Sequence, residues 1–266
     1  MMRLEVISRG HAVPARTFDA VVHSVFHGAA NLQLRRGGRL LTLVTSGAAD
    51  LPQGIRLATP AGFSFEENLD AGGRMTCSEG VLRDERGRLM VDLRAAKRWK
   101  CRLPFVDMAA PPVAAAWASV REALEARWRF MDRGGFPAAR REIGAHLGAL
   151  IEAFRRHDPT IGESAVGLIG LGPGLTPAGD DILVGFLAGL HCAPGSDDGE
   201  CRAFLPALAK AVVRFSQRTN DISRTYLFHA ARGQVSSALA DLAEAIARGD
   251  HTDRLWCTAQ TAMQNG

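Results

Sequence analysis

The sequence predicts an α+β protein, with an N-terminal antiparallel β-rich barrel or sandwich followed by an all-helical C-terminal half. Three observations lead to this prediction. Short runs rich in Leu, Val and Thr alternate with turn residues over residues 1–110, a double proline follows, and beyond it apolar residues recur every three or four positions. We therefore expect a β-rich domain over residues 1–110 and a helical domain over residues 113–266.

Nine short runs in the first domain have the composition of strands. Gly37-Gly38 and Arg86-Gly87 lie between such runs, where hairpin turns are expected. Many short strands with short connections favour a barrel or a sandwich over a parallel sheet. The expected strands cover residues 4–8, 21–26, 31–34, 40–45, 55–58, 74–77, 81–83, 89–93 and 99–103.

The segment Ala109-Ala110-Pro111-Pro112 is expected to be an extended linker, because consecutive prolines disfavour regular elements. After it, apolar residues at helical spacing predict amphipathic helices over residues 117–131 and 143–154. A run that is apolar on every side, Ile182–Leu190, predicts a buried helix. Further helices are expected near residues 200–217, 221–231, 235–248 and 253–263.

Directly before the buried helix lies the run Gly170–Asp181, Gly-Leu-Gly-Pro-Gly-Leu-Thr-Pro-Ala-Gly-Asp-Asp. Thr176 is expected as the N-cap and Pro177 as the first helical residue, so the amides of the first turn would attract an anion or be satisfied by Asp180 and Asp181. The two carboxylates could instead hold a divalent cation such as magnesium that bridges to a phosphorylated or carboxylated ligand. The structural alternative is a turn that leads into a self-capped helix.

The run is neither a phosphate-binding P-loop, because no Lys-Ser/Thr pair ends it, nor a dinucleotide fingerprint, because the glycine spacing differs. A second polar cluster, Thr219–Thr225, stands at another expected helix start. Capping needs only one of its side chains, which leaves the others for ligand contact or for a simple corner between two helices.

Composition excludes several classes of function. The chain has 266 residues, 47% of them hydrophobic and 23% charged, with a formal net charge of +4, which is typical of a soluble globular protein. The arginines are scattered and lack an aromatic platform, so we expect no nucleic-acid binding. Five cysteines without a C-x-x-C pair argue against a zinc site or a disulfide framework.

The chain is expected to be cytoplasmic and to have no contact with membranes. Its first residues lack the long apolar core of a signal peptide. The longest apolar stretch, Ile182–Ala193, is too short to cross a bilayer.

The Gly170–Asp181 run and the later block Asn220–Ser223 resemble the AllH-like family, and the resemblance extends to Val25 and Asn31-Leu32 in the β-rich start. That family is associated with a subunit of oxamate carbamoyltransferase in bacterial allantoin breakdown, a branch of purine catabolism. The resemblance implies a complex with partner subunits that interconverts oxalurate and phosphate with oxamate and carbamoyl phosphate. Members typically continue past residues 264–266 with another Asp-containing segment and a further helix.

The leading hypothesis is therefore a subunit of a carbamoyltransferase complex with a small-anion site at the Gly-rich loop. Its cofactors are unknown, magnesium being possible, and its catalytic residues are unknown. Arg224 is a candidate clamp for a carboxylate, because a guanidinium offers a two-pronged donor. The candidate substrate-binding residues are Gly172, Gly174, Thr176, Gly179, Asp180, Asp181, Asn220, Ser223 and Arg224, of which Asp180 and Asp181 are also the candidate metal ligands.

Two alternatives stay open. In one, the chain is a noncatalytic subunit whose helical half is a docking surface and whose Gly-rich loop is structural. In the other, it is a stand-alone enzyme that acts on a phosphorylated small molecule.

Overall fold

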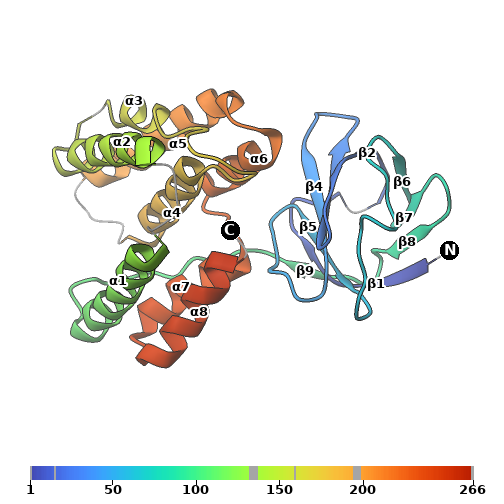
Figure 1. The fold of residues 1–266 in the computed structure, drawn as a ribbon, viewed down its shortest axis with the longest axis horizontal. Coiled ribbons are helices and arrows are strands. Elements are labelled where there is room, and N and C mark those ends of the chain that lie inside the picture. The colour runs from blue at the N-terminus through green and yellow to red at the C-terminus, as the bar shows by residue number, and fades with distance from the viewer. Residues whose placement is uncertain (1, 15, 132–136, 159, 194–198, 265–266) are drawn as a thin grey trace. The chain divides into compact units, whose positions relative to one another are not determined.

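A computed structural model describes residues 2–14, 16–131, 137–158, 160–193 and 199–264 (Figure 1). The chain divides into two compact units, residues 1–101 and 102–266. Within the described residues, the first unit contains the strands and the second contains the α-helices. The predicted α+β class is confirmed.

The first unit contains nine strands in one sheet. Their order is β5-β4-β3-β2-β6-β7-β8-β1-β9, and an additional pairing joins β5 to β1. The strands are β1 Met2–Gly10, β2 Phe18–Val25, β3 Ala29–Leu34, β4 Leu40–Val44, β5 Gly54–Ala58, β6 Arg74–Ser78, β7 Val81–Asp84, β8 Leu89–Asp92 and β9 Lys97–Trp99.

The first strand closes this sheet into a barrel. It pairs antiparallel with β5 and parallel with β8, so that eight strands form a ring and no edge of the ring stays open. The ninth strand pairs parallel with Ser8–Gly10 at the end of β1. Of the two predicted architectures, the barrel is therefore the observed one. Its pairings are mostly antiparallel, and β4 with β5 is a further parallel pair beside those of β1.

Both expected hairpin turns are present. Gly37 and Gly38 have φ values of 83° and 63° between β3 and β4, and Gly87 has a φ of 67° between β7 and β8. These angles lie in the left-handed region that glycine adopts without a steric penalty. The last strand was expected over residues 99–103 but ends at Trp99, because its parallel partner β1 ends at Gly10, the residue that pairs with Trp99.

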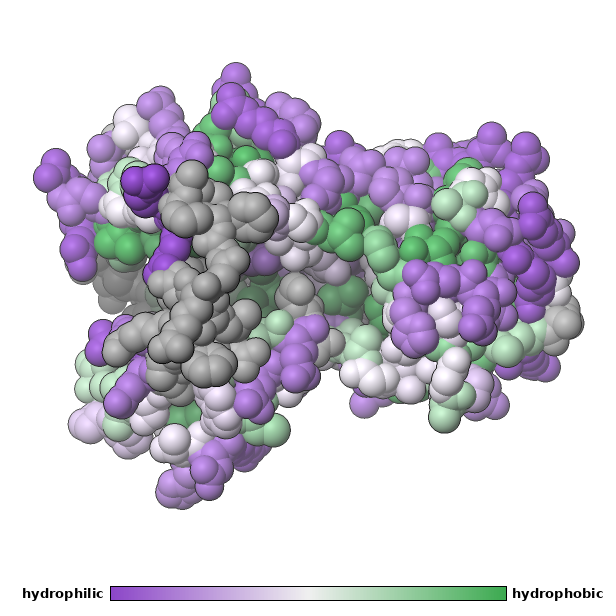
Figure 2. Space-filling view, in the orientation of Figure 1, coloured by the Kyte–Doolittle hydropathy of each residue, from purple (hydrophilic) through white to green (hydrophobic). Residues whose placement is uncertain are grey.

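The barrel core follows from the period of two along each strand. In β6, for example, Met75 and Cys77 are buried while the residues on either side of them are exposed. The buried side chains form one cluster that includes Leu32, Phe65 and Leu82. Hydrophilic residues cover much of the visible face of this unit (Figure 2).

The second unit is helical, as predicted. Its elements are α1 Pro111–Met131, α2 Pro137–Arg155, α3 Ile161–Val166, α4 Ala178–Cys192, α5 Gly199–Phe215, the 3-10 turn η1 Ser216–Arg218, α6 Asp221–Ala230, α7 Ser237–Arg248 and α8 Thr252–Gln264. A buried cluster unites α1, α7 and α8 around Val120, Ile246 and Leu255. Phe154 of α2 packs edge-on against Phe186 of α4 and Phe204 of α5.

Two local expectations were wrong. Pro111 and Pro112 do not lie in an extended linker but begin α1. The first helical turn tolerates proline, because its amides have no acceptor within the helix. The short helix α3 was not expected, since its six residues are too few to show a period.

None of the helices in the described part of the chain is both long enough and apolar enough to cross a membrane.

Candidate functional site

The Gly-rich loop runs from Gly170 to Pro177, between the end of the α3 region and the start of α4. Gly170, Gly172 and Gly174 have φ values of 76°, 115° and 104°, which L side chains rarely adopt. At Gly172 a Cβ atom would also lie 3.0 Å from the amide nitrogen of Ala178. The glycines are therefore required by the path of the backbone, and at Gly172 also by the close approach of α4.

Asp180 binds the first residue of this loop through its side chain. Its side chain is 1% exposed. One carboxylate oxygen accepts a hydrogen bond from the amide of Gly170 at 2.8 Å, and the other accepts one from the hydroxyl of Thr219 at 2.5 Å. Because both donors point at a buried charge, these are strong hydrogen bonds. Asp180 thus links the loop, α4 and the segment before α6.

Asn220 binds the loop near its other end, at Leu175. Its side-chain oxygen caps α6 by accepting from the amides of Ile222 and Ser223, both at 3.0 Å. Its side-chain nitrogen donates to the carbonyl of Leu175 at 2.9 Å. The hydroxyl of Ser223 also approaches this carbonyl, at 3.5 Å. One asparagine therefore caps a helix and holds the loop at the same time.

The start of α4 differs by one residue from the expectation. Pro177 is the N-cap, with φ −51° and ψ 136°, and the helix begins at Ala178. Thr176 does not cap the helix, and its hydroxyl instead hydrogen-bonds to Asp181. A proline at the N-cap is tolerated because the residue there has non-helical backbone angles.

The amides of the first turn of α4 are largely occupied within the protein. The amide of Gly179 donates to the carbonyl of Leu171 at 2.9 Å. The amides of Asp180 and Asp181 both donate to the carbonyl of Pro177, at 2.8 Å and 3.2 Å. The expectation that free amides at this turn receive an anion is thus not met at these three positions. An anion near the loop needs side-chain donors instead.

Asp181 has unusual electrostatics. Although the residue is exposed as a whole, loss of hydration at its carboxylate raises the pKa to about 6. The hydrogen bond from Thr176 opposes this rise, and the negative charge of Asp180 adds to it. Asp181 is therefore protonated in an appreciable fraction of molecules near neutral pH, as a general acid or base requires.

Tyr226, the single tyrosine of the chain, belongs to the same surroundings. Burial raises the pKa of its phenol, and the negative charge of Asp181 raises it further. The two groups therefore lie within electrostatic reach of each other, and the phenol keeps its proton at neutral pH. Tyr226 therefore offers a neutral hydroxyl, a potential hydrogen-bond donor, within electrostatic reach of the Asp181 carboxylate.

Arg224 lies one turn into α6, directly after the loop-binding residues Asn220 and Ser223. Its guanidinium forms an ion pair with Asp221 at 2.7 Å, and its side chain is 41% exposed. The ion pair fixes one edge of the guanidinium, and the exposed part keeps N–H groups available to a further carboxylate.

The structure brings most of the candidate residues together at one corner, where α4 packs against α6. Thr176, Asp180, Asn220 and Ser223 all take part in the hydrogen bonds described above. Arg224 is held by Asp221, and no hydrogen bond joins it to the loop in the part of the chain that the structure describes.

Sequence reasoning did not single out Thr219 or Tyr226. Thr219 stood within the second polar cluster, but nothing local connects it to a carboxylate 39 positions earlier. The available signal for Tyr226 was its uniqueness, directly after that cluster. Among the described residues no group of three or more His, Cys, Asp or Glu could hold a metal ion, and both oxygens of Asp180 are already hydrogen-bonded.

Together, a closed β-barrel and a helical unit with a fastened Gly-Asp-Asp loop define a two-unit protein of α+β class. Two family models match it: the AllH family N-terminal domain over residues 5–98, and oxamate carbamoyltransferase subunit AllH over residues 168–266. The chain belongs to the AllH family. No curated protein and no solved structure matches it significantly.

Proposed function

We propose that this chain is a subunit of an oxamate carbamoyltransferase, and that the Gly-rich loop with the start of α6 forms its site for a small anionic substrate. The description of the family supports the first part, and it implies further subunits. A place in purine catabolism and in the cytoplasm is part of the same proposal and rests on the resemblance alone.

One observation carries the proposed site: a carboxyl, a phenol and a guanidinium lie around the corner of α4 and α6, beside a loop that side chains hydrogen-bond near both of its ends. Asp181 titrates near neutrality, Tyr226 keeps its proton, and Arg224 has an exposed guanidinium. In this proposal Arg224 binds the substrate carboxylate and Asp181 exchanges a proton or, in its ionised form, binds magnesium with the substrate phosphate. Asp180 positions the loop and does not contact the substrate.

The proposal is tested in the complex reconstituted with its partner subunits, by measuring carbamoyl transfer from carbamoyl phosphate to oxamate with and without magnesium. Arg224→Ala removes the proposed clamp and should raise the KM for oxamate about 10-fold or more. Asp181→Asn should lower kcat and remove a pH dependence near pH 6.

Arg248→Ala is the matched control, because Arg248 also forms an exposed ion pair within a helix, with Glu244 at 2.7 Å. It should leave the kinetics unchanged. Unaltered kinetics in both Arg224→Ala and Asp181→Asn would refute the proposed site.

The occupied amides of α4 favour a second candidate, a noncatalytic subunit whose loop is purely structural. In that case the complex would form and keep full activity with Asp181→Asn and Arg224→Ala, and isothermal titration of the chain with oxamate, oxalurate or carbamoyl phosphate would give no heat.

A further inference from the structure

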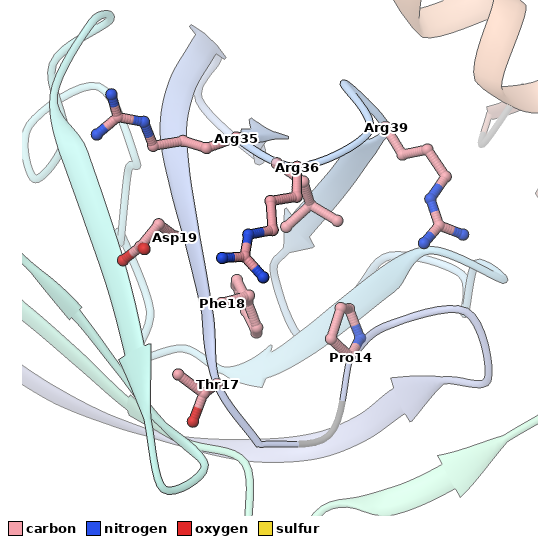
Figure 3. A pocket seen from close by; sticks show the side chains of 8 residues that line it. Pro14, Thr17, Phe18, Asp19, Arg35, Arg36 and Arg39 are labelled. Carbon is pink, nitrogen blue, oxygen red and sulfur yellow. The ribbon is translucent and has the colours of Figure 1, made fainter.

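A pocket with a volume of about 550 Å³ lies in the barrel unit, beside the hairpin that joins β3 to β4. This volume falls in the range of roughly 300–1,000 Å³ that is typical of small-molecule sites. We call it the arginine pocket, and its walls include Phe18, Asp19, Leu34, Arg35, Arg36 and Arg39 (Figure 3).

Three arginines of one short turn line this pocket, and all three are exposed. Backbone hydrogen bonds fix the turn: the amide of Arg35 donates to the carbonyl of Asp19, and the amide of Leu34 donates to the carbonyl of Arg39, both at 2.9 Å. Figure 3 shows the side chain of Arg36 directed toward Phe18, with Arg35 and Arg39 on either side of it. The turn thus places Arg36 over the pocket and adds positive charge on both sides of it.

These arginines differ from others in the same unit. Arg88 binds both Asp70 and Asp84, and Arg94 binds Asp92 at 2.5 Å. Within the described ranges, by contrast, no side chain forms a hydrogen bond or an ion pair with Arg35, Arg36 or Arg39. Three unpaired arginines on one turn give the pocket a positive local potential, which attracts an anion.

The residues that line the pocket indicate which chemical groups a ligand would need. Three guanidiniums and the single carboxylate of Asp19 leave a formal charge of +2 in the pocket. Guanidinium groups bind phosphate through paired N–H donors, Asp19 can accept from ligand hydroxyls, and Phe18 offers an aromatic ring to a flat group. These walls match phosphate, sugar hydroxyls and a base.

We propose that the arginine pocket binds a nucleoside phosphate. The site lies within the barrel unit and does not depend on the Gly-rich loop, so it goes beyond the proposed transferase function. Arg36 contacts the phosphate groups at the centre, Arg35 and Arg39 add positive charge on either side, and Phe18 stacks on the base.

Isothermal titration of the full chain with ADP, adenosine and pyrophosphate tests this. ADP should bind more tightly than pyrophosphate, and adenosine should bind most weakly. Arg36→Ala should weaken ADP binding about 10-fold or more, and Arg36→Lys should restore only part of it, because lysine lacks the planar fork. Phe18→Leu should reduce the preference for ADP over pyrophosphate.

Arg83→Ala is the matched control, since Arg83 is an exposed arginine of the same barrel outside the pocket. It removes the same charge and should leave ADP binding unchanged. Arg224→Ala, in the helical unit, should also leave it unchanged, which separates this site from the proposed substrate site. Thermal unfolding of each variant checks that the fold is intact.

Three outcomes would overturn the proposal: no heat with ADP, equal loss of binding in Arg36→Ala and Arg83→Ala, or pyrophosphate binding as tightly as ADP. Equal loss of ADP binding in the two variants would mean that the net charge of the protein attracts ADP without a specific site. Equal affinity for pyrophosphate and ADP would mean that the pocket does not recognise a nucleoside.

Discussion

Two adjacent carboxylates of the same motif have different physical roles. Asp180 is buried and accepts hydrogen bonds from Gly170 and Thr219, so its charge holds the loop in place. Asp181, the next residue of α4, is solvent-exposed, and the pKa of its carboxyl is raised. Successive helical residues point about 100° apart, which separates the two side chains. The motif therefore combines one structural and one titrating carboxylate.

At Asp181 the raised pKa predicts a pH-dependent cost in stability. In the unfolded chain this carboxyl loses its proton near its ordinary pKa of 3.8, whereas the folded protein retains it up to about pH 6. The folded state therefore binds more protons between these values, and Asp181 makes the free energy of unfolding fall as pH rises through this window. Asp181→Asn abolishes this contribution.

Thermal unfolding of the wild type and Asp181→Asn from pH 4.5 to pH 7.5 measures this effect. The melting temperature of the variant relative to the wild type should increase with pH and level off above about pH 7. A difference between the two proteins that stays constant across this range would show that Asp181 titrates normally.

Among the elements, the β3–β4 and β7–β8 hairpins were predictable because their turn residues and flanking strands are local in sequence. Gly37-Gly38 and Gly87 need positive φ, and the apolar runs beside them supply the strands. The parallel pairing of β1 with β8 was not predictable, because it joins residues more than 80 positions apart. Local pattern thus gave the strands, and only tertiary structure gives the closure of the barrel.

The candidate site was predictable to a similar degree. Glycines and prolines of the loop and the capping residue Asn220 are local signals, and the structure contains both features. The partners of Asp180 were not predictable, since one lies 10 and the other 39 residues away. The arginine pocket was missed because Arg35 and Arg36 follow no pattern that distinguishes a ligand site from an ordinary exposed turn.

The start of α4 requires a glycine at position 179 because of close packing against the backbone, not because of a positive φ. A Cβ atom at this position would collide with the carbonyl oxygen of Leu168, which belongs to the backbone and cannot move aside freely. Gly179→Ala should therefore lower the free energy of unfolding of the helical unit by about 1–3 kcal/mol or more, as overpacking does elsewhere.

Gly185→Ala is the control within the same helix, because nothing lies within 4 Å of the added Cβ atom. This variant should be stabilised by about 0.5–1 kcal/mol, since alanine loses less conformational freedom than glycine. Urea unfolding followed by circular dichroism at the helical band compares the two variants. Similar effects of both substitutions would show that α4 does not pass so close to Leu168.

For the whole molecule, the division into two compact units predicts that damage to one unit stays local. The barrel has its own buried cluster, and α1, α7 and α8 share another. Regions with separate cores open as separate cooperative units. Gly10, the last residue of β1, provides a test. A Cβ atom at this position would collide with the carbonyl oxygens of Leu51 and Pro52.

Gly10→Ala should therefore weaken the strand that closes the barrel, and hydrogen exchange read by mass spectrometry should show faster exchange in β1, β5 and β8. The helices from α4 to α8 should keep their protection, because their cores contain none of these strands. Gly47→Ala, where an added Cβ atom meets nothing within 4 Å, is the matched control and should leave both units unchanged. If protection fell equally in the helices of Gly10→Ala, the two units would form one cooperative whole, and the separation of a barrel site from a loop site would lose its physical basis.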